Sequence, residues 1–477
     1  MDNVFDFRNR LISEYSSFSR SFSKVAAQDI LSKVEGEYDR GRYWPEPLIQ
    51  INPNYKRQGT VQQLVQQGVL HAHCADIFRT GKTEGNSADL HLYVHQLQAL
   101  AKAQNRQSYV VTTGTGSGKS LAFFVPIIDR VLKAKAADPQ KRTRAIVIYP
   151  MNALANSQLE ELDKFLHGFP DDQQPFTVAR YTGQESASER QEIANNPPDI
   201  LLTNFMMLEL ILTRYEEVDR QVVEHCQGLE FLVLDELHTY RGRQGADVAL
   251  LVRRLRERLQ ADQLVCIGTS ATMSSTGTQA DRNKTVADVA SLLFGAQISE
   301  SDVIGETLER VTNPGKDIEA VKPLLKTALL KDAHQWPDFA AFSDDPLAVW
   351  VELSLGIELP VDEPPRRAKP ITLDDAAKRL APDAQCPLED AHAGLQRFLV
   401  AAHDVKTPQG RAPFAFKLHQ FISGPGKVLA TLEPEGVRHI TLDAQRYAPG
   451  RQDEGTQLYP VHFCRDCGQE YHPVWRS

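Results

Sequence analysis

Short apolar runs alternate with helix-patterned stretches through the middle of the chain. The runs cover residues 109–111, 145–149, 177–181, 200–202, 231–234 and 264–267. They are too short for helices and rich in β-branched residues, so they predict strands. Strands that alternate with helices predict a parallel sheet with helices on both faces, and such sheets bind ligands at the carboxyl ends of their strands. We therefore expect an α/β domain over residues 85–295.

The pattern changes on either side of this domain. Five apolar residues near the start recur at helical spacing, namely Phe7, Leu11, Tyr15, Phe18 and Phe22. Their stripe predicts a mostly helical region over residues 1–84, and it indicates a helix packed on its own domain or a helix that docks on a partner. Residues 296–412 are expected to form a helical insertion with a proline-rich linker. Residues 413–477 carry short strand-like runs, so the C-terminal part is expected to be α+β.

Composition and charge exclude several classes of protein. The chain has 477 residues, a net charge of −9 and no apolar run long enough to cross a bilayer. Its first residues lack the features of a signal peptide, so we expect a cytoplasmic protein with no membrane partner. Six scattered cysteines do not make a disulfide framework. An acidic chain is not a basic coat protein for nucleic acid, although a local track can still grip a phosphate backbone.

The first expected strand ends in a glycine-rich loop. The loop reads Thr113-Gly114-Thr115-Gly116-Ser117-Gly118-Lys119-Ser120, and a helical segment follows. Glycines let successive backbone N–H groups face one phosphate, and the helix start adds positive potential. Lys119 can then reach the β- and γ-phosphates, and the Ser120 hydroxyl can ligate Mg²⁺. This context favours a P-loop over an ordinary glycine-rich turn, although Thr113 stands where the strict pattern has glycine.

Another expected strand ends in two carboxylates. Asp235 and Glu236 follow the apolar run 231–234, at the edge of the sheet where the P-loop is expected. Asp235 would hold Mg²⁺, usually through a water, and Glu236 would orient and deprotonate an attacking water. An acidic pair after a strand is common by itself. Paired with the P-loop, it indicates hydrolysis of a nucleoside triphosphate.

Three motifs follow one another along the expected α/β domain. They are the P-loop, Asp235-Glu236-Leu237-His238, and Ser270-Ala271-Thr272. In this order they resemble the superfamily 2 DEAD/DEAH-box helicases. The resemblance implies a RecA-like parallel sheet, the first of two motor lobes, that binds ATP and Mg²⁺ and contacts a nucleic-acid strand.

A narrower resemblance rests on three segments, residues 92–96, 149–158 and 235–242. They are similar to large bacterial helicases related to the MrfA-type DNA-repair helicases and to the helicase of the Druantia anti-phage system. This likeness is strong over residues 90–300. It implies single- or double-stranded nucleic acid as a partner, with DNA favoured over RNA.

The resemblance also implies roles for single residues. Gln96 would read the adenine edge, and His238 would couple the acidic box to the second lobe rather than merely cap a strand end. Ser270 and Thr272 would link the nucleotide site to the strand-binding face. Six residues would lie at the nucleic acid, although most are also ordinary turn residues: Pro150, Asn152, Thr182, Gly183, Thr203 and Asn204. The arginines of 241–258 are more typical of a solvated helical face than of a DNA contact.

Near the end of the chain, Cys464 and Cys467 form a Cys-x-x-Cys-Gly knuckle. Two thiolates at this spacing fit half of a tetrahedral Zn²⁺ site, and no strand-to-helix context supports a redox pair. Two ligands rarely suffice, so we expect zinc in a longer protein and little in this chain. His462, His472 or Cys386 would have to complete a site here.

The sequence after residue 273 lacks the arginine-bearing helix pattern of a second motor lobe. We therefore expect the N-terminal part of a longer helicase, a motor split by an insertion, or a chain that works with a second polypeptide. The leading function is an ATP-dependent DNA helicase or translocase in DNA repair or anti-phage defence. The alternative is a nucleotide-dependent DNA-binding module without turnover of its own. A P-loop kinase is disfavoured by the acidic box and the Ser-Ala-Thr motif.

Overall fold

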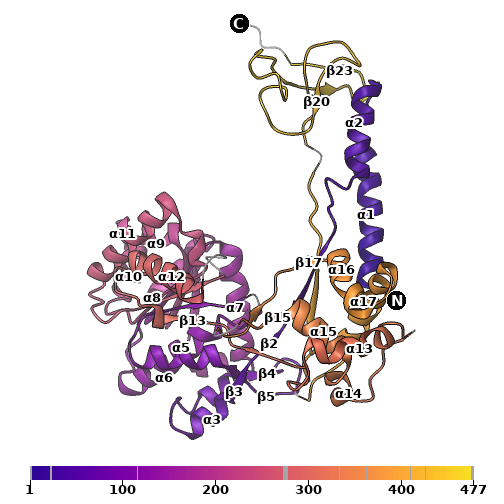
Figure 1. Ribbon diagram of the computed structural model, residues 1–477. Coiled ribbons are helices and arrows are strands. Elements are labelled where there is room, and N and C mark those ends of the chain that lie inside the picture. Colours follow the sequence, from indigo (N-terminus) through magenta and orange to yellow (C-terminus); the bar gives the residue numbers. More distant parts are fainter. Residues whose placement is uncertain are drawn as a thin grey trace. The chain divides into compact units, whose positions relative to one another are not determined.

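The computed structural model describes residues 3–21, 24–114, 116–271, 278–331, 333–360, 363–408, 410–424 and 426–473. The chain divides into two compact units (Figure 1). One runs from Tyr55 to Glu309, and the other joins Met1–Asn54 to Arg310–Ser477. These units do not follow the four regions proposed from the sequence, and that division stays a prediction. None of the helices in the described stretches combines the length and apolarity needed to cross a bilayer.

The unit 55–309 is built on a seven-stranded sheet in which every pairing is parallel. In spatial order the strands are β13 (Val303–Gly305), β7 (Tyr109–Thr112), β12 (Val265–Ser270), β11 (Phe231–Leu234), β8 (Ala145–Tyr149), β10 (Ile200–Asn204) and β9 (Val178–Tyr181). All six apolar runs expected as strands are strands, so the predicted α/β fold with a RecA-like parallel sheet is confirmed. The seventh strand, β13, lies beyond the expected domain end at residue 295.

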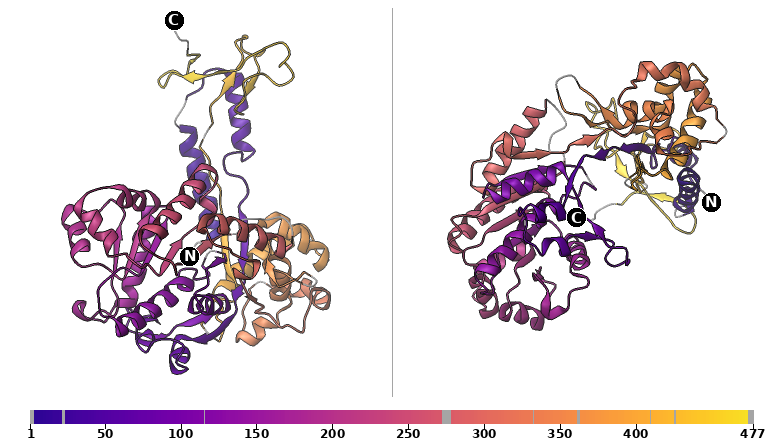
Figure 2. Two further views of the ribbon diagram at one scale, coloured as in Figure 1. Left: turned by 90° about the vertical axis from the view of Figure 1, so that its left-hand side faces the viewer. Right: turned by 90° about the horizontal axis from the view of Figure 1, so that it is seen from below.

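Helices cover both faces of this sheet, as Figure 1 and Figure 2 show. One face packs on α5 (Val94–Gln104), α6 (Leu121–Ala137) and α7 (Asn152–Leu166). The other packs on α8 (Ala187–Asn195), α9 (Phe205–Thr213), α10 (Glu217–Glu224), α11 (Gly242–Arg258) and α12 (Gln279–Phe294). Successive strand residues point to opposite faces, so Tyr109 and Val111 enter the first core while Val110 enters the second. This explains why the strands are apolar throughout.

The start of this unit is less helical than expected. It contains β3 (Arg57–Thr60), α3 (Val61–Gln66), α4 (Cys74–Ile77), β4 (Arg79–Thr80), β5 (Ala88–Asp89) and β6 (His91–Tyr93). Thr60 and Gln63 form a capping box that starts α3. Leu70, Ile77 and Phe78 extend the core beneath α5 and α6.

The unit formed by 1–54 and 310–477 is a helical layer with small antiparallel sheets. Its helices are α1 (Val4–Ser21), α2 (Gln28–Asp39), α13 (Ile318–Leu329), α14 (Phe339–Ser343), α15 (Pro346–Val351), α16 (Leu373–Ala384) and α17 (Leu388–His403). β1 (Leu48–Asn52) pairs antiparallel with β17 (Ile371–Thr372) and β18 (Ala415–His419). Trp350, Phe342 and Phe398 are fully buried in its main core.

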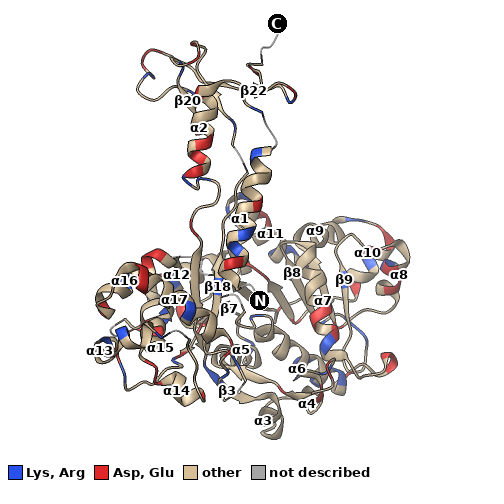
Figure 3. Ribbon diagram, turned by 90° about the vertical axis from the view of Figure 1, so that its right-hand side faces the viewer, with Lys and Arg blue, Asp and Glu red and all other residues tan. Residues whose placement is uncertain are grey.

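Short strands follow β18 toward the C-terminus. They are β19 (Leu429–Ala430), β20 (Ile440–Thr441), β21 (Tyr459–Pro460), β22 (His462–Phe463) and β23 (Glu470–Tyr471), and β15 (Ile357–Glu358) pairs with β16 (Arg366–Arg367) earlier in the chain. α2 carries a run of acidic residues (Figure 3). One of them, Asp29, pairs with Arg438 at 2.7 Å, which ties α2 to these strands.

α1 confirms the predicted helix but not its packing. Phe7 and Phe18 are 53% and 56% exposed, whereas Phe5 and Ile12 are buried. The interpretation of the stripe as a core-packing face is therefore wrong for these residues. Helical spacing identified an apolar stripe, but a second stripe one position away faces the core. Phe22 lies outside the described residues.

Candidate functional site

Three neighbouring strands bring the candidate residues to one edge of the sheet. β7, β12 and β11 lie side by side and run in the same direction. The P-loop follows β7, the acidic pair follows β11, and Ser270 ends β12. Because their carboxyl ends meet, residues more than a hundred positions apart in sequence face one another.

The P-loop is held in shape by two glycines and one hydroxyl pair. Gly116 and Gly118 have φ angles of +77° and +67°, which residues other than glycine rarely adopt. A Cβ on Gly118 would stand 2.6 Å from Gln96 Nε2. The buried hydroxyls of Thr113 and Ser117 share a 2.6 Å hydrogen bond, which glycine at 113 could not make. Thr115 lies outside the described residues.

The acidic pair faces the P-loop lysine. Lys119 Nζ lies 3.5 Å from Glu236 Oε1. Burial raises the pKa of Asp235, with the hydroxyl of Thr269 acting against it and the neighbouring Glu236 adding to it. Among the residues that the structure describes, Glu236 Oε2 is buried and accepts no hydrogen bond, although His238 Nδ1 lies 3.3 Å away. A cation beside these oxygens would relieve both conditions, so the donor set of Ser120, Asp235 and a water fits Mg²⁺.

Thr269 is a site residue that the sequence reasoning missed. Its hydroxyl donates to Asp235 Oδ1 and accepts the backbone N–H of Glu236 at 3.2 Å. The threonine therefore orients the Asp235 carboxylate and the backbone of Glu236 from the neighbouring strand. Its position directly before the Ser-Ala-Thr motif is the feature of the sequence that could have identified it.

His238 contacts two of the predicted motifs. Its Nδ1 lies 3.3 Å from Ser270 Oγ and 3.3 Å from Glu236 Oε2. The acidic box and the Ser-Ala-Thr motif are thus brought into direct contact through this ring. The coupling roles of His238 and Ser270 stay predictions, and Thr272 lies outside the described residues.

His95 and Gln96 contact backbone carbonyl groups of the P-loop. His95 Nε2 lies 3.0 Å from the Ser117 carbonyl, and Gln96 Nε2 donates to the Gly118 carbonyl at 2.9 Å. The other end of the Gln96 amide accepts the N–H of Tyr93. Both ends of Gln96 are therefore bonded to backbone, so its predicted contact with adenine would require at least one of these bonds to open. No motif assigned a role to His95.

Acid should lower the free energy of unfolding through protonation of His95, which lies next to the P-loop. Burial lowers the pKa of His95 to about 4 from an ordinary 6.5. The fold therefore stabilises the neutral ring, and this contribution is complete above pH 6.5 and lost as the pH falls toward 4. Between pH 7 and pH 5 the loss should be about 2 kcal/mol of unfolding free energy.

Denaturant titrations of the parent and of His95→Gln would measure this loss. Glutamine keeps a donor for the Ser117 carbonyl but does not titrate. The variant should therefore show a flatter pH dependence by that amount. Equal pH dependence in the two proteins would contradict the assignment.

Glu306 is a second residue that the motifs do not reveal. It follows β13, and its Oε2 accepts the backbone N–H of Gly114 at 3.2 Å. A carboxylate thus contacts the start of the P-loop from the strand next to β7. The short strand that carries it lies outside the expected domain, so the sequence could not bring Glu306 to the site.

Three of the residues expected at nucleic acid form one cluster. Asn204 Nδ2 donates to Asn152 Oδ1 at 2.7 Å and to the Thr182 carbonyl at 3.0 Å. Asn152 is the first residue of α7, Asn204 caps α9 and accepts the N–H of Met207, and Thr182 follows β9. The starts of helices favour phosphate. Pro150 directly follows β8, two residues before Asn152. Thr203 is not brought to this surface, because its side chain is buried and its hydroxyl donates to the Tyr181 carbonyl.

Glu185 organises the turn at Thr182 and Gly183. Its carboxylate accepts the N–H groups of both residues, at 2.7 and 2.9 Å, and the Nε–H of Arg180 at 2.8 Å. These bonds lower the pKa of Glu185 against the opposing effect of burial. The backbone donors of this turn are therefore already engaged, and a phosphate contact there would have to displace Glu185.

The cysteine pair lies in the β22–β23 hairpin of the other unit. Backbone N–H groups of Cys467 and Asp466 lower the pKa of Cys464. His472 Nδ1 lies 3.0 Å from the Pro460 carbonyl. Across the described stretches of the chain, no group of three or more His, Cys, Asp or Glu side chains could hold a metal. Zinc at Cys464 and Cys467 stays a prediction for a longer protein.

A family model matches the segment that contains the candidate site. The DEAD/DEAH box helicase family model matches residues 93–280, which include Lys119, Asp235, Glu236 and Ser270. The chain is 33% identical over 186 residues to the uncharacterized ATP-dependent helicase YprA of Bacillus subtilis, covering 39% of this chain and 23% of that protein. It is 32% identical over 213 residues to the Lhr helicase/uracil glycosylase of Escherichia coli, covering 42% and 13%.

The Druantia protein DruE of Escherichia coli is 28% identical over 294 residues, covering 38% of this chain and 16% of that protein. The chain thus spans less than a quarter of the length of these relatives. Among solved structures, the crystal structure of the DUF1998 helicase MrfA bound to DNA aligns with a TM-score of 0.41 and 23% identity. That alignment covers 64% of this chain and 40% of the other.

Proposed function

We propose that this chain, whose residues 93–280 form a DEAD/DEAH box helicase domain, is the first motor lobe of an ATP-dependent DNA helicase or translocase. The domain is distantly homologous to the Lhr, DruE and MrfA-type large helicases. The observation that carries the proposal is the approach of Lys119 to Glu236 between adjacent strand ends. A phosphate-binding lysine and a general base then face the same space.

The proposed reaction is the hydrolysis of ATP by water. The N–H groups of the P-loop and Lys119 hold the β- and γ-phosphates. Ser120 and Asp235 would hold Mg²⁺, which when bound neutralises phosphate charge. Glu236 takes a proton from the water that attacks the γ-phosphorus, and the bond to the bridging oxygen of ADP breaks. Thr269 and His238 keep the two carboxylates in place.

A nucleic-acid strand is proposed to lie across the starts of α7 and α9. Asn152 and Asn204 would meet its phosphates, with Pro150, Thr182 and Gly183 beside them. DNA is proposed because the motifs resemble DNA-repair and anti-phage helicases, and either pathway is consistent with that likeness. Comparing ATP hydrolysis with DNA and with RNA added tests the choice of strand.

A nucleotide-dependent DNA-binding module without turnover of its own is the second candidate. It is favoured by the strand pairings of the unit 1–54 with 310–477, which are antiparallel throughout its described residues. Such pairings do not build a second RecA-like wall for the nucleotide. DNA-stimulated ATP hydrolysis would support the motor, and DNA binding without hydrolysis would support the module.

Replacing Lys119 with alanine tests the nucleotide site directly. The variant should bind ATP about 10–100-fold more weakly, because a charge-assisted contact with the phosphates is lost. Titration with a fluorescent ATP analogue gives the two dissociation constants. Lys284→Ala is the matched control, because Lys284 is an exposed lysine of α12 paired with Asp288. Unchanged affinity in Lys119→Ala would remove the basis of the proposal.

A further inference from the structure

A cavity of about 880 Å³ opens at the amino ends of the sheet strands in the unit 55–309. Its wall includes Glu230 and Phe231, where β11 begins, and Arg142, shortly before β8. The nucleotide site lies at the carboxyl ends of the same strands. The cavity, which we name the basic cavity, is therefore separate from the P-loop and the acidic box. Its size is typical of small-molecule sites.

The wall of the basic cavity carries more guanidinium groups than its buried carboxylates can pair. Glu230 is 5% exposed and meets three arginines of the wall. Its Oε2 lies 2.6 Å from Arg130 Nε and 3.3 Å from Arg106 Nη1, and its Oε1 lies 3.7 Å from Arg142 Nη2. The single carboxylate of Glu230 is thus shared by three guanidinium groups.

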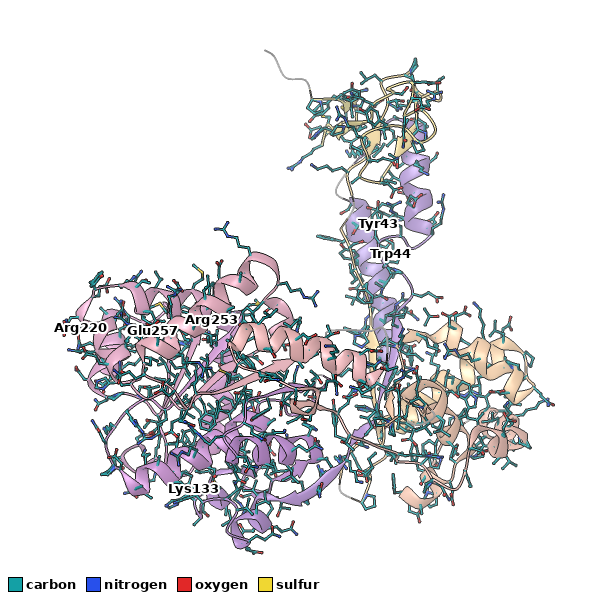
Figure 4. All side chains as sticks on the ribbon, turned by 60° about the vertical axis from the view of Figure 1, so that its left-hand side comes forward. Tyr43, Trp44, Lys133, Arg220, Arg253 and Glu257 are labelled. Atoms are coloured by element: carbon teal, nitrogen blue, oxygen red, sulfur yellow. The ribbon has the colours of Figure 1, made fainter. Side chains whose placement is uncertain are left out.

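The remaining charges of the wall do not remove this excess. Lys133 is paired with the buried Asp129 at 2.8 Å, so that pair is internally neutral. Asp262 is exposed at the rim, where water solvates it. Figure 4 labels Lys133 on this unit. The carboxylates that hold the wall together are buried, whereas the arginines are 31–48% exposed and present positive charge to the cavity.

Several donors of these arginines have no partner in the described part of the chain. Arg142 makes no side-chain hydrogen bond there, and its Nη2 lies 3.7 Å from Glu230 Oε1. Arg130 donates through Nε to Glu230 and through no other nitrogen in the described residues. Unpaired guanidinium donors at a concave surface suit an anion with several oxygens, since guanidinium groups bind phosphate in bidentate fashion.

Two helices end at the wall of the basic cavity, and their ends place two of its lining residues. Arg106 and Gln260 both line the cavity and have positive φ. Each follows the end of a helix, α5 or α11, where a left-handed residue commonly closes the last turn. The N–H of Gln107 donates to the Lys102 carbonyl, and the N–H of Ala261 donates to the Arg256 carbonyl. Arg106 is further fixed over the ring of Phe231, 5.5 Å from its centroid.

We propose that the basic cavity binds a small molecule bearing phosphate groups, held by Arg106, Arg130 and Arg142. Its phosphate oxygens take donors of Arg130 and Arg142 and compete there with Glu230, which pairs with the same guanidinium groups. The site is distinct from the P-loop and does not depend on ATP hydrolysis.

Calorimetric titration of inorganic pyrophosphate into Lys119→Ala tests the proposal, because that background weakens the P-loop. Saturable binding is expected. Arg142→Gln should weaken it about tenfold or more, since a charge-assisted contact is lost. Arg142 makes no hydrogen bond through its side chain in the described residues, so this variant should keep its melting temperature. Arg220→Gln is the matched control, on an exposed arginine of α10 paired with Glu217 (Figure 4).

A second variant predicts a change of opposite sign. Glu230→Gln removes the anion that competes for the three arginines, so pyrophosphate should bind more tightly. Absence of saturable binding below about 1 mM would overturn the proposal. So would affinity that is equal in the parent background and in Arg142→Gln. Citrate binding with no pyrophosphate binding would replace phosphate by carboxylate as the ligand and would also overturn it.

Discussion

Glu236→Gln should retain ATP and lose its hydrolysis, by about 10²–10⁴-fold. The carboxylate is the proposed base: its Oε2 accepts no hydrogen bond from the described residues, and its Oε1 lies 3.5 Å from Lys119 Nζ. An amide of the same shape cannot take a proton from water. The phosphate contacts proposed for the P-loop come from its backbone N–H groups and Lys119, so ATP affinity should change little.

Two measurements on one preparation separate binding from chemistry. Titration with an ATP analogue gives affinity, and phosphate release with DNA present gives turnover. Glu257→Gln is the matched control, because Glu257 is an exposed glutamate of α11 away from the strand ends (Figure 4). Turnover by Glu236→Gln at the parent rate would assign the base to another residue, with Asp235 the next to replace.

The sequence was sufficient to predict the central sheet. Its strands are buried on both faces, so each stands out as an uninterrupted apolar run, and each phosphate or acidic motif directly follows one. β13 was not predicted, because its three residues, Val303–Gly305, make too short an apolar run to recognise as a strand. Glu306 was lost with it, since its contact with Gly114 depends on β13 pairing with β7.

The supporting residues of the site could not be predicted for a related reason. Thr269 contacts Asp235 only because β12 lies next to β11. Local sequence patterns do not predict the order of strands in a sheet. His95 and Glu185 act on backbone groups of distant or irregular segments. A motif identifies a residue type at a spacing, whereas these contacts arise from how the elements pack.

The division into two units could not be predicted either, because it depends on contacts between segments that are far apart in the sequence. β1 pairs with β18, across more than 350 residues of chain. Local patterning predicted a helical start and a strand-rich end but not their union. The stripe on α1 illustrates a further limit, since periodicity identifies an amphipathic helix without saying which of two neighbouring faces is covered.

The largest expected effect concerns the chain acting alone. The purified 477-residue chain should hydrolyse ATP about 10³–10⁵-fold more slowly than a motor with two lobes, and it should not unwind duplex DNA. The transferring phosphoryl group needs positive charge from both sides of a cleft. Residues 93–280, which the helicase family model matches, would supply Lys119 and the proposed Mg²⁺ ligands from one side.

No opposite wall is present among the residues that the structure describes. Their one parallel sheet is the seven-stranded sheet of 55–309, and the pairings of the other unit are antiparallel. Unwinding also requires two lobes that open and close on the strand, because a single lobe has nothing to move against. The slow ATP turnover of the chain should therefore rise, and strand displacement should first appear, when a second RecA-like lobe is supplied on the same or another polypeptide. Multiple-turnover unwinding by this chain alone, absent in Glu236→Gln, would show that copies of the chain pair to build the missing wall or that an arginine of 310–477 reaches the nucleotide.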